Sequence, residues 1–210
     1  MAPIDPLRKV ERLKKTAGTK QSGAAQAGRI PPGQHITKKF PVLTYGETPV
    51  IDKSEFRLNV WGLVENPLEL TWDELMALPK RSITTDIHCV TTWSMLDTRW
   101  TGIPFQAILE KARPLPEAKA VMQHGYGGYT TNLLLKDMLD DDVLLAYEFG
   151  EKPLAIEHGG PLRMLVPKLY FWKSTKWLNG LEFIAEDAPG FWERNGYHMH
   201  GDPWTEERFG

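Results

Sequence analysis

The sequence of 210 residues has a single cysteine, Cys89, so no disulfide bond can form within the chain. It also has no stretch close to the roughly 18 consecutive apolar residues of a membrane-spanning helix. The basic N-terminus, residues 1–20, lacks the apolar segment of a secretory signal. Because disulfides are typical of secreted proteins, these absences predict a cytoplasmic location and no membrane span.

Neither sign of charge is in clear excess, because 25 Lys and Arg face 27 Asp and Glu and leave a net charge of −2. This balance gives no reason to expect a nucleic-acid partner or binding to an acidic membrane. Hydrophobic residues make up 41% of the chain, which is enough for one sizeable core. Eight tryptophans indicate a rigid core or an aromatic-walled pocket, and we expect most of them in the core.

Composition divides the chain into an extension and one domain. Basic residues cluster at 8–20 and small residues follow at 18–28. This composition buries little surface, so residues 1–39 are predicted to form a flexible basic extension. Residues 40–210 are predicted to form a single domain, in which 186–210 is an aromatic-rich C-terminal tail.

Hydrophobic periodicity predicts a mixture of strands and short helices. The alternation at 55–64 indicates a strand, and Thr71 with Glu74 forms a capping box that should start a helix ending near Leu78. Further strands are expected at 82–89, 118–124, 143–149, 162–166 and 181–185, and further helices at 104–112 and 132–139. Strands mixed with short helices, without regular βαβ alternation, predict an α+β fold.

Cys89 follows a predicted strand and opens a polar turn, in the run His88-Cys89-Val90-Thr91-Thr92-Trp93-Ser94. A thiol in that place suits a nucleophile or a soft metal ligand. A buried, inert cysteine is the plain alternative. A Cys–His hydrolase or transferase, with His124 or His158 as the base, is a second alternative.

A basic segment follows the turn His158-Gly159-Gly160-Pro161-Leu162-Arg163, and its polar residues are Lys168, Lys173, Ser174, Thr175 and Lys176. Fixed positive charge beside hydroxyl and amide donors suits a phosphate, although no Walker motif is present. A basic surface hairpin is the alternative. The pair His198 and His200 near Asp202 is weak evidence for a metal site, because two histidines in a polar tail are common.

These segments, in this order, resemble the sulfite oxidase-like molybdopterin oxidoreductases. The resemblance rests on the Cys89 run with Trp100-Thr101-Gly102-Ile103-Pro104, on His124-Gly125 with Tyr129, on Leu144-Leu145-Ala146-Tyr147-Glu148, on 158–163 and on Lys176-Trp177-Leu178. It covers about residues 40–185. The tail, with Gly190-Phe191-Trp192-Glu193-Arg194 and Gly201-Asp202-Pro203-Trp204, resembles a stand-alone bacterial cytoplasmic branch of the family.

The resemblance implies the sulfite oxidase fold and one molybdenum bound by the dithiolene of a pyranopterin, the molybdopterin cofactor. Cys89 matches the family's cysteine ligand to the metal, and Tyr129 matches an active-site tyrosine. The positions that match cofactor contacts are Thr44, Tyr45, His88, His124, His158, Arg163, Ser174, Thr175 and Lys176. No pattern for a flavin, nicotinamide or iron–sulfur site is present, and the haem and dimerisation domains of animal sulfite oxidases are absent. The resemblance therefore implies a small-molecule substrate and a separate electron-transfer partner.

One departure from the family concerns the substrate. Sulfite oxidases resemble one another in an Asn-Arg-Arg run just after the cysteine, whereas this chain has Thr91-Thr92-Trp93-Ser94. An oxyanion needs paired positive charge in a closed pocket, and this run supplies none. We therefore expect two-electron oxygen-atom transfer on a neutral, sulfoxide-like or N-oxide-like substrate rather than on sulfite.

Overall fold

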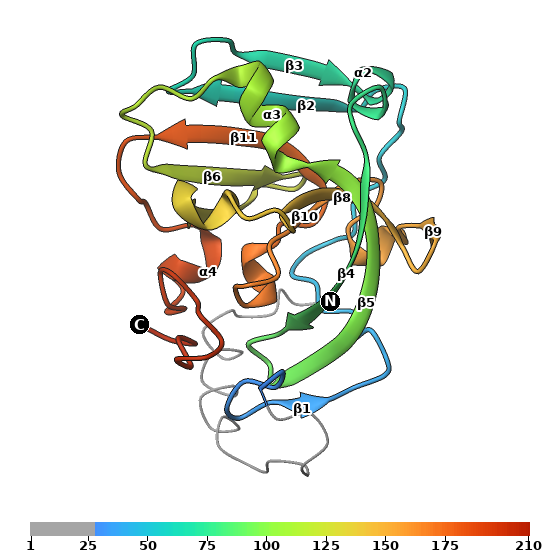
Figure 1. Ribbon diagram of the computed structural model, residues 1–210, viewed down its shortest axis with the longest axis vertical. Coiled ribbons are helices and arrows are strands. Elements are labelled where there is room, and N and C mark those ends of the chain that lie inside the picture. Colours follow the sequence, from blue (N-terminus) through green and yellow to red (C-terminus); the bar gives the residue numbers. More distant parts are fainter. Residues whose placement is uncertain (1–27) are drawn as a thin grey trace.

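Two β-sheets and a few short helices form residues 28–210, the part of the chain that this computed structural model describes (Figure 1). Each sheet contains one parallel pair of strands among antiparallel pairs. This architecture confirms the predicted α+β class. None of the helices within 28–210 is long and apolar enough to cross a membrane.

The first sheet has six strands: β1 (His35–Ile36), β4 (Arg81–His88), β5 (Trp93–Pro104), β8 (Leu144–Phe149), β9 (Lys152–Pro153) and β10 (Arg163–Leu165). The long strand β5 pairs with β4 along most of its length and with β8 near its C-terminal end. The turn between β4 and β5 contains Cys89, so the sheet carries the cysteine at the end of its longest hairpin.

The second sheet has five strands in the order β3 (Leu68–Thr71), β2 (Arg57–Gly62), β11 (Leu178–Ile184), β6 (Ala120–Gly125) and β7 (Tyr129–Leu134). Strand β11 lies between β2 and β6, parallel to the first and antiparallel to the second. All six strands predicted from periodicity are confirmed, as β2, β4, β6, β8, β10 and β11.

The helices are α2 (Trp72–Met76), α3 (Phe105–Ala112) and α4 (Phe191–Arg194), with 3₁₀ turns η1 (Leu135–Met138), η2 (Ile156–His158) and η3 (Phe171–Lys173). The predicted capping box is present, since Thr71 accepts from the Glu74 amide and Glu74 accepts from the Thr71 amide. Helix α3 follows Pro104 as predicted.

The helix predicted at 132–139 is wrong. Residues 129–134 form strand β7, which pairs with β6, and only 135–138 form a 3₁₀ turn. Tertiary contacts decide this segment, because the Asn132 side chain donates to Asp187 and the Asn132 oxygens accept from the buried Lys173 ammonium. Strand β5 was missed, since its polar and glycine residues hide its pattern.

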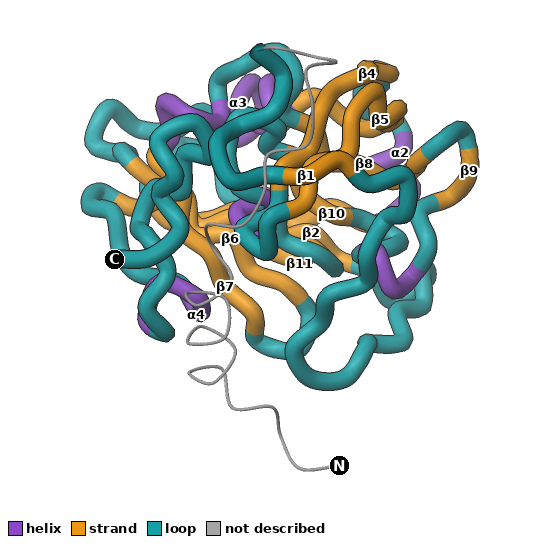
Figure 2. Tube along the Cα trace, turned by 90° about the horizontal axis from the view of Figure 1, so that it is seen from below, coloured by secondary structure: helices purple, strands orange, loops and turns teal. Residues whose placement is uncertain are grey.

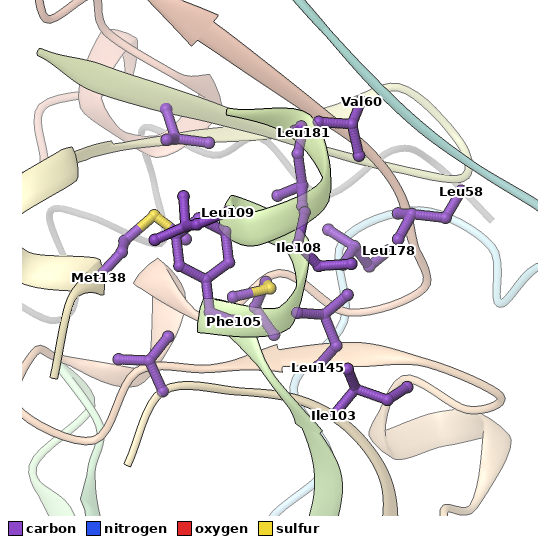
Figure 3. Packing of buried hydrophobic residues seen from close by; sticks show 14 of the residues in the cluster. Leu58, Val60, Ile103, Phe105, Ile108, Leu109, Met138, Leu145, Leu178 and Leu181 are labelled. Atoms are coloured by element: carbon purple, nitrogen blue, oxygen red, sulfur yellow. The ribbon is translucent and has the colours of Figure 1, made fainter. Parts of the chain in front are cut away.

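Two hydrophobic clusters fill the molecule. The first, here named the aliphatic cluster, joins buried side chains of α3 to side chains of both sheets. Ile108 of α3 lies beside Leu58 and Leu178, and Leu145 is close by (Figure 3). The aromatic cluster surrounds the Cys89 turn and includes Trp93, Trp100 and Trp172. Five of the eight tryptophans are buried, in agreement with the expectation that most are core residues.

Residues 28–39 pack on the domain, although the sequence placed them in the extension. Strand β1 pairs in parallel with the start of β5 (Figure 2). Gln34, just before β1, is only 2% exposed. Arg29 forms an ion pair with Asp86 at 2.7 Å. The structured part therefore begins before residue 40. Residues 1–27, with the basic cluster, lie outside the described residues.

Candidate active site

A cavity of about 690 Å³ lies beside the Cys89 turn. Its walls come from segments far apart in the chain: the loop 40–50, the cysteine turn, the loop 126–129, residues 157–177 and the C-terminal residues 191–197. Four of the buried tryptophans line it, namely Trp93, Trp172, Trp177 and Trp192. These tryptophans therefore belong to the core and to an aromatic-walled pocket at the same time.

Cys89 lies in a tight turn at the wall of this cavity. Its amide donates to the Trp93 carbonyl at 2.9 Å, and the Thr92 amide donates to the Cys89 carbonyl at 3.0 Å. Thr92 closes the turn with a φ of 74°, a left-handed conformation that is uncommon for a β-branched residue. The Thr91 hydroxyl donates to the Cys89 sulfur at 3.2 Å. Cys89 as a whole is 7% exposed, and its sulfur already accepts a hydrogen bond.

Arg163 supplies a buried positive charge next to the cysteine and Tyr129. Its guanidinium lies 4.0 Å from the Phe171 ring centroid, a cation–π distance. Burial lowers the pKa of Arg163 to about 9, against the opposing attraction of Tyr129 and Cys89. The group therefore stays charged at neutral pH and favours the thiolate form of a nearby cysteine.

The Arg163 guanidinium also holds the surrounding backbone together. It donates to the carbonyls of His158, Met164 and Ser174 at 2.7, 3.1 and 2.8 Å. The two glycines of this segment serve the same packing: a side chain on Gly159 would meet Lys176, and one on Gly160 would lie 2.1 Å from the Leu154 carbonyl. The glycines thus allow the chain's own segments to approach one another.

Lys176 ties the cavity's entrance loop to the segment around η2. Its ammonium donates to the Leu43 carbonyl, the Thr44 hydroxyl and the Glu157 carbonyl at 3.0, 2.7 and 3.0 Å. Tyr45, the next residue of the loop, packs against Phe191 with ring centroids 4.8 Å apart. A lysine 132 positions away from Thr44 therefore fixes the loop in which Thr44 and Tyr45 line the cavity.

His158 lines the cavity with its ring stacked on Phe40, centroids 3.8 Å apart and planes 6° from parallel. Burial, and then the charge of Arg163, lower the pKa of His158 below its ordinary value. The imidazole is therefore neutral at pH 7. One ring nitrogen then donates and the other accepts, which suits contact with a heterocycle.

Tyr129 lies on the opposite wall, and its hydroxyl donates to the Trp172 carbonyl at 2.8 Å. Burial, reinforced by Glu193, raises the pKa of Tyr129 well above its usual range, so the phenol keeps its proton. Trp172 is held in turn, because its indole donates to Glu193 at 2.8 Å. Glu193 and Lys173 form an ion pair at 2.7 Å with both side chains fully buried.

The structure brings together eight of the eleven residues predicted for the site. Those that line the cavity are Thr44, Tyr45, Cys89, Tyr129, His158, Arg163, Ser174 and Lys176. Ser174 is 2% exposed, and its hydroxyl accepts from the Val166 amide at 2.9 Å. The remaining three, His88, His124 and Thr175, do not line it, and their role as cofactor contacts stays a prediction.

Each of these three side chains has other surroundings. The His88 ring bonds to the Ser94 hydroxyl at 2.8 Å, across the β4–β5 hairpin. His124 pairs with Glu182 at 3.0 Å on the second sheet. Thr175 is completely buried beneath the cavity wall.

The histidines of the C-terminal tail pair with carboxylates. His200 bonds to Glu207 and to Asp137 at 2.8 and 3.1 Å, and His198 lies 3.4 Å from Glu207. Within 28–210 no group of three or more His, Cys, Asp and Glu side chains is arranged to hold a metal. The tail histidines thus connect the C-terminus to η1.

Sequence reasoning missed several cavity residues, among them Phe40, Phe171, Trp172, Phe191 and Tyr197. Only the aromatic-rich character of the tail pointed to Phe191 and Tyr197. Phe40 carried no motif, although its ring contacts His158, Trp93 and Trp100. Large aromatic residues at a pocket wall and in a core have the same sequence signature, so periodicity could not separate them.

The residues of the cavity fit a molybdopterin. A sulfur donor lies at the wall, as a soft metal requires. The cations Arg163 and Lys176 complement a phosphate, and a neutral imidazole with aromatic walls complements a flat heterocycle. The cavity volume is also within the range of sites that enclose a cofactor.

Relatives support the same assignment. An uncharacterized oxidoreductase of Bacillus subtilis is 50% identical over 91% of this chain and 96% of its own length. A putative protein-methionine-sulfoxide reductase subunit of Azospira oryzae is 31% identical over 84% of this chain and 68% of its own. Sulfite oxidase of Arabidopsis thaliana is 26% identical over 74% of this chain and 49% of its own.

The fold agrees with these relatives. The sulfane dehydrogenase SoxCD of Paracoccus pantotrophus superimposes with a TM-score of 0.63 at 23% identity, over 72% of this chain and 43% of that one. The model of the oxidoreductase molybdopterin binding domain matches residues 45–192. The predicted sulfite oxidase-like fold and the molybdopterin cofactor are thereby confirmed. This chain belongs to the molybdopterin-binding oxidoreductase family.

Proposed function

We propose that the chain is a molybdenum enzyme that removes an oxygen atom from a small neutral substrate of the sulfoxide or N-oxide class, with Cys89 as the protein's ligand to the metal. The observation that carries the proposal is the Cys89 sulfur at the wall of the cavity, close to the buried charge of Arg163 and beside neutral walls. A coordinated thiol is deprotonated, and a nearby cation stabilises that thiolate.

The bound cofactor supplies the two-electron redox chemistry, and the chain's residues bind and orient. Arg163 and Lys176 would hold the phosphate, while the neutral His158 and the loop at Thr44 and Tyr45 would contact the ring system. Tyr129 keeps its proton, and its hydroxyl would have to turn away from the Trp172 carbonyl to donate to a substrate oxygen. Four tryptophans exclude water from the same space.

The reaction needs an outside source of electrons. Cleaving the S=O bond of a sulfoxide consumes two electrons and two protons and releases the oxygen as water, with the sulfur reduced to a thioether. No sequence pattern in the chain indicates a second redox group. We therefore propose a separate electron-carrier protein as partner. A cytoplasmic location stays a prediction.

Charge favours a neutral substrate over sulfite. Arg163 and Lys176 are the Lys and Arg side chains among the described residues that line the cavity, and both are assigned to the phosphate of the cofactor. Two other arginines point elsewhere: Arg99 pairs with Glu151 at 2.7 Å, and Arg194 donates to the Pro189 carbonyl. A dianion next to Cys89 would therefore lack paired charge, which is costly in a closed pocket.

The test uses holoprotein from a molybdate-fed host. Elemental analysis is expected to give about one molybdenum per chain, and a reduced viologen dye is expected to support reduction of dimethyl sulfoxide or trimethylamine N-oxide. A protein without molybdenum whose Cys89 is alkylated and loses hydrolase activity would overturn the proposal. A molybdenum protein that turns over sulfite and neither oxide would overturn the substrate class alone.

A further inference from the structure

The backbone of the cysteine turn is held from outside the region that matches the family. The Cys89 carbonyl accepts from the Gln34 side chain at 3.1 Å, and the Thr92 carbonyl accepts from the His35 amide at 2.9 Å. The Val90 carbonyl accepts from the Arg208 guanidinium at 2.8 Å. These three donors lie before residue 45 or after residue 192, the limits of the family match.

The three donors are here named the terminal clamp: Gln34, the His35 amide and Arg208. Gln34 and Arg208 are 2% and 4% exposed. Arg208 also donates to the Pro32 carbonyl at 3.1 Å, so it joins the N-terminal segment, the cysteine turn and the C-terminus. Its guanidinium lies 5.0 Å from the Tyr170 ring centroid, a cation–π contact.

The position of the clamp matters because the turn it holds is tight and strained. Thr92 stays in its left-handed conformation only while the surrounding contacts fix it. The Cys89 carbonyl is bound on one side by the turn itself and on the other by Gln34. A shift of this peptide moves the Cys89 Cβ and sulfur with it. Groups that orient a metal ligand tune the metal as well as hold the ligand.

We propose that Gln34 and Arg208 are positioning residues that set the direction of the Cys89 sulfur toward the molybdenum. This inference rests on the proposed function, because it requires Cys89 to be the ligand. Gln34 and Arg208 would thereby influence the electronic properties of the metal, although neither residue lines the cavity.

The first experiment compares Gln34→Leu with two controls. Asn66→Leu is the amide control at an exposed position, because Asn66, between β2 and β3 of the second sheet, also donates to a backbone carbonyl, that of Lys111 at 3.1 Å. Leu75→Ala is the stability control, because Leu75 is fully buried in the aliphatic cluster. Two readouts are taken on the full chain with cofactor: hydrogen exchange of the peptide covering 89–93, and the Mo(V) electron paramagnetic resonance spectrum.

Gln34→Leu is expected to speed hydrogen exchange at 89–93 about tenfold, since one buried hydrogen bond is lost. It is also expected to shift the Mo(V) g-values at a molybdenum content equal to that of the wild type. Both controls should keep the wild-type spectrum, and Leu75→Ala should still lower the melting temperature. A wild-type spectrum in Gln34→Leu, or the same shift in Leu75→Ala, would overturn the positioning role.

Arg208 provides an independent second test. Arg208→Lys keeps one cationic donor for the Val90 carbonyl, whereas Arg208→Met keeps none. The spectral shift should therefore be smaller in Arg208→Lys than in Arg208→Met, and equal shifts would count against the role. If the wild-type holoprotein has no molybdenum, the proposed function fails and the positioning role fails with it. If it has a signal that neither Gln34→Leu nor Arg208→Met changes, only the positioning role fails.

Discussion

The aliphatic cluster and the aromatic cluster differ in how they are packed and in whether they contain buried charge. In the aliphatic cluster, side chains of α3 and the two sheets meet through regular elements, and apolar contacts account for the packing. In the aromatic cluster, turns and loops meet around Cys89, and charged groups such as Arg163 and the Lys173–Glu193 pair are buried there. Burying charge opposes folding unless every charge is paired. The comparison indicates that the first region maintains the fold and the second was shaped by the site.

Cys89→Ser gives the largest expected effect and the sharpest separation of the two regions. An oxygen donor is harder than a thiolate, so turnover should fall by about a thousandfold or more. The melting temperature should change little, because the side chains have nearly the same shape. A dye-coupled assay measures the turnover, and calorimetry measures the melting temperature. Full turnover in the variant would contradict the ligand assignment.

Lys173→Met tests whether the aromatic cluster depends on its buried charges. The variant leaves Glu193 buried and unpaired, which is expected to cost about 3–5 kcal/mol in the free energy of unfolding. Urea unfolding measures the loss. The double variant Lys173→Met with Glu193→Gln should recover much of it, because no unpaired charge remains. If Lys173→Met were as stable as the wild type, the stability of the aromatic cluster would not depend on its buried ion pair.

Substrate preference tests the chemistry of the second region directly. The catalytic efficiency for sulfite is expected to be at least about a hundredfold below that for a sulfoxide, corresponding to about 2.7 kcal/mol. Thr91→Arg, which adds a cation at the cavity wall, should narrow this ratio. Steady-state assays with sulfite and dimethyl sulfoxide supply the numbers. A wild-type efficiency for sulfite of about 10⁶ M⁻¹s⁻¹ would contradict the charge argument.

Arg163→Lys separates the charge of this residue from its hydrogen-bonding geometry. Lysine keeps the charge but cannot reach the carbonyls of His158, Met164 and Ser174 together. Losing one of these bonds should loosen the cavity wall around the cofactor, and a cost of about 1.5–3 kcal/mol passed on in full would correspond to about one to two decades in cofactor affinity. Pterin content after long dialysis is the measurement. Retention equal to the wild type would mean that charge alone suffices.

Thr71→Ala is expected to have the smallest effect, and it changes the part of the molecule that contains the aliphatic cluster. Loss of the capping box at α2 is expected to cost about 1 kcal/mol. Turnover per molybdenum should be unchanged, because α2 is remote from the cavity. Thermal unfolding and dye-coupled assays on the same sample test both statements. A parallel loss of turnover would show that the two regions are coupled.

The sequence predicted the first region well and the second only in part. Alternation and capping identified β2, α2 and α3 because those patterns are local. Cys89, Arg163 and Lys176 stood out from their local sequence, and their ordered resemblance to a family decided between the roles that this left open. Gln34 and Arg208 carried no signal, since their partners are 55 and 118 positions away and are backbone carbonyls, which leave no trace in side-chain patterns. Strand β7 was misread because its buried Asn132 takes its partners from the C-terminal part of the chain.

Because β11 lies between β2 and β6, the second sheet can be completed only after both of these earlier strands have been synthesised. The central strand of the second sheet comes more than a hundred residues after its neighbour β2, so β2 and β6 leave the ribosome with open edges. Open edges invite pairing with other chains until the missing strand arrives. Arg208 is synthesised later still, and only then does the cysteine turn acquire its last hydrogen-bond donor. The cysteine turn therefore reaches the geometry described here only after the segment that contains Arg208 has packed against it.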